Sequence, residues 1–285
     1  MIMAGILYLC ATPIGNLNDM TFRVLDTLRE VDLIAAEDTR NSIKLLNHFE
    51  IKTPMTSYHE YNKFEKAETL IQKLKEGQNI ALITDAGTPA ISDPGEVLVR
   101  RAKEEGLTVT SLPGACAAIT ALTLSGLSTR RFVFEGFLPS EKKERTEVLE
   151  SLSKEERTII LYEAPHHLKG TLKELKGALG GDRKITLCRE LTKKFEEAVP
   201  MTVDAAIDFY AENEPRGEYV LVLEGRDKEA AKEEKKKQFE SMTIEEHMEI
   251  YLSEGLDKKE AMKKVAADRG VSKRDIYQSL LGETE

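Results

Sequence analysis

The stretch ITDAGTPAISDPG, residues 83–95, combines residue types that are typical of a ligand-binding loop. It carries an acid at Asp85 and a glycine at Gly87, but neither lysine nor arginine. A carboxylate there would repel a phosphate, whereas it could accept a hydrogen bond from a ribose hydroxyl or an ammonium group. Neither the Walker pattern nor the dinucleotide-binding glycine pattern is present. We therefore expect a neutral or cationic ligand; the alternative is a purely structural turn, in which Asp93 caps a helix begun by Pro94.

Two further loops rich in Gly and Pro are predicted at the same place. Residues 10–21 leave the first predicted strand through Pro13, and residues 112–122 leave the fourth through Gly114. Open α/β sheets bind ligands at the carboxyl edge of their parallel strands, so the three loops should form the floor of one pocket. The small residues after Gly114 either permit close packing of a helix on the sheet or leave room for a flat group such as adenine.

The elements that must position these loops follow from the hydropathy pattern. Short apolar runs alternate with longer amphipathic runs, which indicates repeated βα units. Strands are predicted in two sets, over 6–11, 32–37, 79–84 and 107–113, and then over 131–138, 158–164, 184–191 and 217–225. Helices are predicted between them, for example over 63–77 and 96–106. We infer an α/β fold, with an N-terminal α/β domain over residues 1–128 and a C-terminal α/β domain over residues 129–226.

The composition changes after residue 226. Residues 227–241 mix charges of both signs with almost no apolar side chain, which predicts a charged helical linker. Three capping residues follow, each with an acid three positions later, at Thr243, Asp257 and Ser272. Residues 242–285 are therefore predicted to form a small three-helix tail of the helix-turn-helix type.

The tail has a predicted core and an ambiguous surface. Its core is expected to contain Ile250, Leu252, Met262, Val265, Ala266, Ile276, Leu280 and Leu281. Residues 243–285 carry 7 basic and 10 acidic side chains, so a protein or dimer contact has to be weighed beside contact with RNA. Lys273, Arg274 and Tyr277 are the residues best suited to meet a phosphate backbone.

Overall composition limits the classes of function. The 285 residues carry a formal net charge of -9, which argues against nonspecific coating of nucleic acid but permits a local basic patch. No apolar run approaches the roughly 20 residues of a membrane-spanning helix, and we expect a cytoplasmic protein. Cys10, Cys116 and Cys188 lie in separate apolar settings, which predicts reduced thiols without zinc. His166 and His167 are adjacent and cannot face one site from a helix, so no metal is expected.

The order of several short motifs resembles that of the tetrapyrrole methylase family. TPIGN, AEDTR, SYHEYN, ITDAGTPAISDPG and LPGACAAITAL follow one another in the first half, and LYEAPHHL, RELTKKFEE and RGEYVLVLEG in the second. The order is most similar to that of family members that methylate the 2′-hydroxyl of a cytidine in 16S rRNA. The resemblance implies two α/β domains with S-adenosylmethionine in the cleft between them, 16S rRNA within the small ribosomal subunit as the partner, and a homodimer.

The resemblance also implies which residues bind the cofactor. GTPAI, residues 87–91, stands where corrin-type relatives carry a G-D-P motif, and Asp85 is expected to take over the hydrogen bonds of the acid that Thr88 replaces. The expected cofactor-binding residues are Pro13, Ile14, Asp85, Gly87, Thr88, Ile91, Cys116, Ala117 and Tyr162. A sulfonium-bearing ligand suits a pocket without lysine.

Methyl transfer from a sulfonium requires mainly that the ribose oxygen be aligned and that water be excluded. A positioned base would help to remove the hydroxyl proton. The candidate catalytic residues are His59, which is the first choice, and Glu37, with Arg40 as a clamp for phosphate or ribose. A structural role for His59 is the alternative. Lys193 and Lys194 either meet RNA or are solvated. Two other functions stay open, namely C-methylation of a tetrapyrrole and a noncatalytic ribosome-assembly factor.

Overall fold

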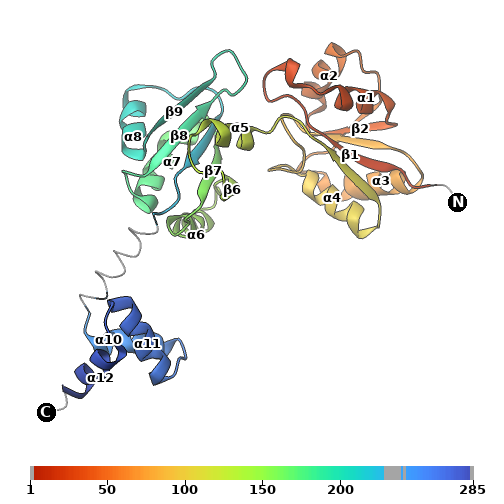
Figure 1. The fold of residues 1–285 in the computed structure, drawn as a ribbon. Helices are drawn as coiled ribbons and strands as arrows, with labels where there is room; N and C mark the ends of the chain where they lie inside the picture. Colours follow the sequence, from red (N-terminus) through yellow and green to blue (C-terminus); the bar gives the residue numbers. More distant parts are fainter. Residues whose placement is uncertain (1–2, 228–238, 240–241, 283–285) are drawn as a thin grey trace. The chain divides into compact units, whose positions relative to one another are not determined.

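The computed structural model describes residues 3–227, 239 and 242–282. Residues Met1–Glu224 form one compact unit with two β-sheets, and residues Gly225–Glu285 form a second unit that contains three described helices (Figure 1). No helix in the described ranges is long and apolar enough to cross a membrane.

The first sheet contains five parallel strands in the order β3-β2-β4-β1-β5. The strands are β1 (Ile6–Cys10), β2 (Leu33–Ala36), β3 (Met55–Ser57), β4 (Ile80–Ile83) and β5 (Thr108–Leu112). The apolar runs predict four of them correctly. The edge strand β3 is not predicted, because it has three residues and all of them are only half-buried.

Helices cover both faces of this sheet. They are η1 (Leu17–Asp19), α1 (Phe22–Glu30), α2 (Thr39–His48), α3 (Lys63–Lys75) and α4 (Gly95–Glu104). α1 and α2 lie on one face, and α3 and α4 on the other (Figure 1). Alternate strand residues point to opposite faces, so Leu7 and Leu9 pack against α3 and α4, whereas Cys10 packs against α1 and α2.

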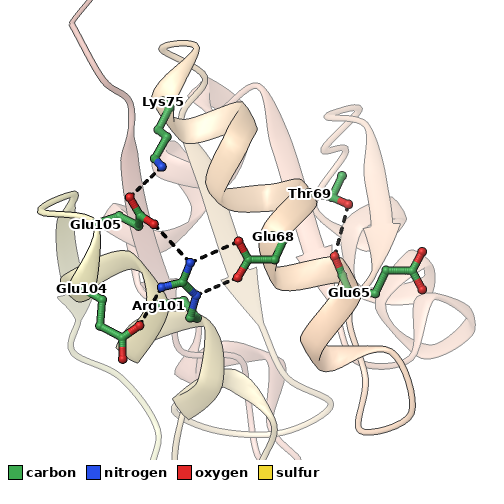
Figure 2. A network of polar contacts seen from close by, with 7 residues as sticks. All are labelled: Glu65, Glu68, Thr69, Lys75, Arg101, Glu104 and Glu105. Carbon is green, nitrogen blue, oxygen red and sulfur yellow. Dashed lines mark hydrogen bonds and ion pairs between the residues drawn. The ribbon is translucent and has the colours of Figure 1, made fainter.

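A network of ion pairs joins α3 to α4 on their outer surface (Figure 2). The guanidinium of Arg101 on α4 contacts Glu68 on α3 at 2.7 Å, and it contacts Glu104 and Glu105 at 2.6 and 3.1 Å. Lys75 at the end of α3 reaches Glu105 at 2.6 Å. Hydrogen bonds, the largest from Glu68, raise the pKa of Arg101 above its ordinary value. The groups are partly exposed, so water and salt screen each pair and the individual pairs add little to stability.

The second sheet is mixed, with the order β6-β7-β10-β8-β9. Its strands are β6 (Phe132–Phe137), β7 (Thr158–Glu163), β8 (Lys184–Arg189), β9 (Glu197–Thr202) and β10 (Tyr219–Leu223). β10 is antiparallel to both of its neighbours, β7 and β8. The edge strand β9 is not predicted from the sequence, because Pro200 interrupts its short apolar stretch. An edge strand tolerates the proline.

The helices of the second sheet are unequally divided between its faces. They are α5 (Ala117–Leu124), α6 (Lys142–Ser153), α7 (Pro165–Leu179) and α8 (Val203–Glu212). α6, α7 and α8 share one apolar core with the sheet. α5 packs on the other face, where Ala118 and Ala121 meet Ile160, Cys188 and Val220. α5 is thus a layer of the second sheet although it precedes residue 129; the division at residues 128 and 226 stays a proposal.

The C-terminal unit contains α10 (Ile244–Ser253), α11 (Lys258–Arg269) and α12 (Lys273–Gly282). The three predicted helix starts are confirmed: Thr243 and Asp257 cap α10 and α11, and Ser272 Oγ accepts the Asp275 N–H at 3.2 Å. The core consists of Met248, Ala261, Met262, Val265, Ala266 and Ile276.

Two details of the tail differ from expectation. Leu252 and Leu281 are 37% and 56% exposed, so their predicted place in the core is wrong: both lie on the solvent side of their helices. Of the predicted charged linker at 227–241, all residues except Asp227 and Phe239 lie outside the described residues. The ring of Phe239 stacks on that of His247 at 3.9 Å between centroids.

Candidate active site

The three loops rich in Gly and Pro meet at the carboxyl edge of the first sheet, after β1, β4 and β5. Thr12 and Gly87 exchange two backbone hydrogen bonds, of 2.9 and 3.0 Å. The hydroxyl of Thr12 donates to the carbonyl of Thr84 at 3.1 Å, and the hydroxyl of Thr88 donates to the carbonyl of Ala115 at 2.9 Å. These bonds join the three loops into one floor.

The loops approach so closely that glycine is required at two positions. Gly87 has a φ of 84°, and a Cβ on it would lie 3.2 Å from Cγ2 of Ile14. A Cβ on Gly114 would lie 2.6 Å from the Cβ of Ala11. A side chain at Gly114 would therefore push the loop after β5 away from β1, and one at Gly87 would both strain the backbone and fill the space above the floor.

Asp93 stabilises the unusual backbone of the loop at residues 83–95. Its Oδ1 accepts the N–H of Gly95 at 2.8 Å and of Ala90 at 3.0 Å, and its Oδ2 accepts that of Ile91 at 3.1 Å. Ala90 and Ser92 have φ values of 68° and 61°, a region that non-glycine residues enter only where other contacts over-determine it. The expected cap is off by one residue: α4 begins at Gly95, and Pro94 rather than Asp93 occupies its N-cap position. Asp93 lies one residue earlier, where it accepts the first N–H of the helix and fixes the loop that forms part of the floor.

A cleft of about 450 Å³ lies between this floor and the second sheet. Of the nine expected cofactor-binding residues, eight line it: Ile14, Asp85, Gly87, Thr88, Ile91, Cys116, Ala117 and Tyr162. Pro13 is not among its lining residues and lies half-buried just before Ile14. The second sheet adds Phe137, Glu190 and Tyr219. Tyr219 was not predicted, because only the antiparallel direction of β10 brings the beginning of that strand to the cleft.

The cleft is rich in carboxylates. Its acidic lining residues are Glu37, Asp85, Asp93, Glu163, Glu190 and Glu218. Within the described lining, the one Lys or Arg is Lys193, so the expectation of a pocket without lysine is wrong at this residue. The excess of acids favours a ligand that carries positive charge over a phosphate.

Lys193 is held away from the role of a phosphate ligand by two acids. Its ammonium contacts Glu190 at 2.9 Å and Glu218 at 2.8 Å. Burial acts to lower the pKa of Lys193, but the hydrogen bonds to the two carboxylates outweigh it and raise the pKa overall. The stem of Lys193 runs against Gly15, and the neighbouring Thr192 Oγ1 accepts the N–H of Asn16 at 3.1 Å. This loop therefore connects the second half of the chain to the loop after β1.

Tyr162 forms a wall of the cleft. Its hydroxyl accepts the N–H of Ala118 near the start of α5 at 3.2 Å. The rings of Phe134 and Phe137 pack edge-on against it at 5.0 and 5.6 Å between centroids. Burial raises the pKa of Tyr162 to about 12, so it stays protonated at neutral pH and positions groups rather than accepting a proton.

Two of the three candidate catalytic residues lie at the cleft or beside it. Glu37 lines the cleft, where its Oε2 accepts the hydroxyl of Thr84 at 2.5 Å. Arg40 is not among the lining residues; its side chain is 88% exposed and pairs with Asp38 at 2.7 Å, and its hydrogen bonds lower the pKa of Asp38 to about 2. The N–H of Asp38 donates to Asp85 Oδ1 at 3.2 Å, which joins this loop to the floor.

His59 is not brought to the cleft. It follows the edge strand β3, and β2 lies between β3 and β4. Its Nε2 is 3.4 Å from Nδ2 of Asn62, and its buried Nδ1 has no hydrogen-bond partner. The residue order places His59 and Asp85 at the same sheet edge, but the strand order separates them.

Comparison with known proteins agrees with this geometry. The family model described as Tetrapyrrole (Corrin/Porphyrin) Methylases matches residues 6–207. A curated relative from Bacillus subtilis (strain 168), named ribosomal RNA small subunit methyltransferase I, is 51% identical over 96% of this chain and 94% of its own length. A relative of the same name from Synechocystis sp. (strain ATCC 27184 / PCC 6803 / Kazusa) is 48% identical over 96% of each chain.

Solved structures share the fold at low sequence identity. The crystal structure of diphthine synthase superposes on this chain with a TM-score of 0.61 at 13% identity, and the match covers 78% of this chain and 90% of that chain. Uroporphyrin-III-C-methyltransferase from Thermus thermophilus has a TM-score of 0.55 at 17% identity, covering 77% and 94%. The chain has two β-sheets around a carboxylate-rich cleft, and the family model matches most of its length. It therefore belongs to the tetrapyrrole (corrin/porphyrin) methylase family.

Proposed function

We propose that this protein transfers a methyl group from S-adenosylmethionine to the ribose 2′-hydroxyl of one cytidine in small-subunit rRNA. One observation carries the proposal: over 96% of its length, the chain is 51% and 48% identical to relatives named ribosomal RNA small subunit methyltransferase I. It acts where ribosomes are, in the cytoplasm. We also propose that the protein is a homodimer, as the resemblance implies. Sedimentation velocity, which measures the mass of the particle in solution, tests this.

The cleft suits the proposed methyl donor. Its volume of about 450 Å³ falls within the range of sites that enclose small ligands and cofactors. Ile14, Gly87, Cys116, Ala117 and Tyr162 offer apolar or backbone surface for the flat adenine ring and the methionine chain. The acids favour the positively charged sulfonium, and a carboxylate such as Asp85 can accept from a ribose hydroxyl or the ammonium. When bound, the cofactor supplies an electrophilic methyl group.

The chain's own residues align the nucleophile and handle its proton. Glu37 is the candidate base that faces the cleft, and its bond from Thr84 fixes the carboxylate in place. Arg40 is the proposed clamp for the phosphate or ribose of the target nucleotide, and its exposed side chain supports this role. A role for His59 requires the RNA to reach the end of β3, so we rank it below Glu37.

One assay separates this function from its rivals. The protein is incubated with labelled S-adenosylmethionine and, in turn, undermethylated small ribosomal subunits, free 16S rRNA and a porphyrinogen; the RNA is then digested to nucleosides. We expect label in 2′-O-methylcytidine. Label on the porphyrinogen alone would refute the proposal, and tight binding to the small subunit without any turnover would favour an assembly factor.

Replacing Arg40 by alanine tests the clamp. We expect the KM for RNA to rise at least about tenfold, because one charge-assisted contact to the target nucleotide is lost. The Kd of the cofactor should change less than about twofold, because Arg40 is not among the residues that line the cleft. Arg100→Ala, which removes another exposed arginine with one acidic partner, is the matched control. An equal loss of RNA methylation and cofactor affinity would contradict the assignment.

Thiol alkylation tests the position of the cofactor. Cys116 and Cys188 both line the cleft, but Cys188 is buried whereas Cys116 is half-buried. Burial raises the pKa of Cys10 and of Cys188 to about 12, so neither should react at neutral pH. We expect iodoacetamide to modify Cys116 first. S-adenosylhomocysteine at 100 times its Kd should slow the reaction about 100-fold, because about 1% of the cleft stays empty. Cys116→Ser is the control, and an unprotected Cys116 would place the cofactor elsewhere.

A further inference from the structure

The C-terminal unit separates its charges by helix. α10 carries three acids and neither lysine nor arginine, whereas α11 and α12 together carry seven basic and three acidic residues. This excess of positive charge is notable in a chain whose formal net charge is -9. A local cationic surface on an acidic protein indicates an anionic partner.

Internal contacts already occupy two of the three acids, and they also occupy one of the bases. Asp268 accepts the hydroxyl of Tyr251, and Asp275 accepts the N–H of Ser272 at 2.9 Å. Arg269 donates to the carbonyls of Met242 and Thr243 at 2.7 and 2.8 Å. Arg269 therefore serves the fold of the unit, whereas Lys258, Lys259, Lys263 and Arg274 are exposed.

Two of these exposed cations, Lys259 and Lys263, lie on the flank of α11 that points away from α10. Lys264 and Asp268, four residues apart, both meet Tyr251 of α10, with the Lys264 ammonium 4.9 Å from the ring centroid. Lys259 and Lys263 share the opposite flank of the helix, on the far side of its buried stripe. Both are exposed, and neither has an acid within 4.0 Å in the described part of the chain.

α12 also presents an exposed face. Ile276 is buried and Leu280 packs partly against the core, which turns Arg274, Tyr277 and Gln278 outward. Tyr277 is 53% exposed, although an aromatic ring normally gains by burial. An exposed aromatic residue between a cation and an amide is typical of surfaces that contact RNA.

The connection between the two helices has the form of a nucleic-acid-binding motif. Gly270 ends α11 in the left-handed conformation with a φ of 66°, and α12 begins three residues later at Lys273. Two helices joined by such a short turn with glycine occur in the helix-turn-helix motif, whose second helix faces the nucleic acid while the first helix contacts the backbone. Here α12 is the second helix, and Lys259 and Lys263 extend from the first.

We propose that Lys259, Lys263, Arg274 and Tyr277 form a second RNA-binding surface, which anchors the small-subunit rRNA by its phosphate backbone while the cleft acts on the target nucleotide. This surface contributes affinity and no chemistry. The proposal rests on the proposed function for the identity of the RNA, but binding can be measured without catalysis.

The test compares three full-length proteins. One is wild type, one carries Lys259→Gln, Lys263→Gln and Arg274→Gln, and the control carries Glu245→Gln and Glu249→Gln on α10. Affinity for 16S rRNA and for small ribosomal subunits is measured by filter binding between about 50 and 200 mM salt, a range over which phosphate contacts lose much of their affinity. Circular dichroism and thermal melting establish that each variant is folded.

The triple variant is expected to bind RNA about 10–100-fold more weakly, and its slope of log affinity against log salt should be shallower by roughly two to three. Its affinity for S-adenosylhomocysteine and its kcat at saturating RNA should equal those of wild type, and the control should bind RNA at least as well as wild type. Unchanged RNA affinity and slope in the triple variant would overturn the inference.

The remaining outcomes are also decisive. If wild type shows the steep slope and the triple variant does not, yet neither transfers a methyl group to RNA, the anchoring surface stands and the proposed function fails. If the triple variant binds free 16S rRNA normally but loses affinity only for small subunits that contain protein, the surface contacts a ribosomal protein and the inference is wrong.

Discussion

Gly87→Val is expected to weaken binding of S-adenosylmethionine by at least about 100-fold, or ~3 kcal/mol. The new side chain would project toward Ile14 across the floor of the cleft, because a Cβ at this position already comes within 3.2 Å of the Ile14 methyl group. The substitution also forces a β-branched residue to a φ of 84°, which costs roughly 1–3 kcal/mol. Isothermal titration calorimetry measures the loss of affinity, and thermal melting measures the loss of stability.

Gly106→Val is the matched control, because it also places valine at a positive φ but does not project a side chain into the cleft. Gly106 has a φ of 69°, and a Cβ on it would meet no atom within 4 Å. We expect this variant to lose stability and to keep the cofactor affinity of wild type. Equal cofactor affinity in both variants would show that the floor at Gly87 does not contact the cofactor.

Asp93→Ala is expected to lower the free energy of unfolding by about 3 kcal/mol, because three backbone N–H groups lose their acceptor at roughly 1 kcal/mol each. The positive φ values of Ala90 and Ser92 would then lack their support, so the loop should relax and the cofactor Kd should rise about tenfold or more. Denaturant titration and calorimetry measure the two effects.

Two variants make the Asp93 result specific. Asp93→Asn keeps the Oδ1 oxygen that accepts from Ala90 and Gly95, so it should recover most of the lost stability. Thr21→Ala removes a single helix cap, on the N–H of Val24, and should cost about 1 kcal/mol without changing cofactor affinity. If Thr21→Ala weakened cofactor binding as much as Asp93→Ala, the effect would be one of general stability.

Much of the fold could be predicted from the sequence, because most of its strands are continuous apolar runs. β1, β2, β4 and β7 are largely buried, and their composition alone distinguishes them from the flanking helices. β3 and β9 lie at sheet edges, where burial no longer dictates an apolar run, and they could not be recognised. The motif order led to the methylase family, which the family match confirms.

The site was predictable where a motif and a strand end coincide. The loops after β1, β4 and β5 carry their own Gly and Pro signals, so most of the first half's lining residues could be named. Lys193 could not be placed, because the positive φ values of Glu190 and Thr192 fold its loop back toward Gly15. The distinction between Glu37 and His59 depends on strand order, which alternation of hydrophobic runs does not encode.

The packing of α5 determines how this protein can be divided. A recombinant fragment that began at residue 129 would leave Ile160, Cys188 and Val220 without their cover, and such bare apolar surface promotes aggregation. A fragment that ended at residue 128 would contain α5 without the sheet on which it packs, and the exposed apolar helix would promote aggregation. To keep α5 with the second sheet, the boundary between two fragments has to lie before Ala117. That boundary falls in the turn that contains Cys116, which lines the cleft.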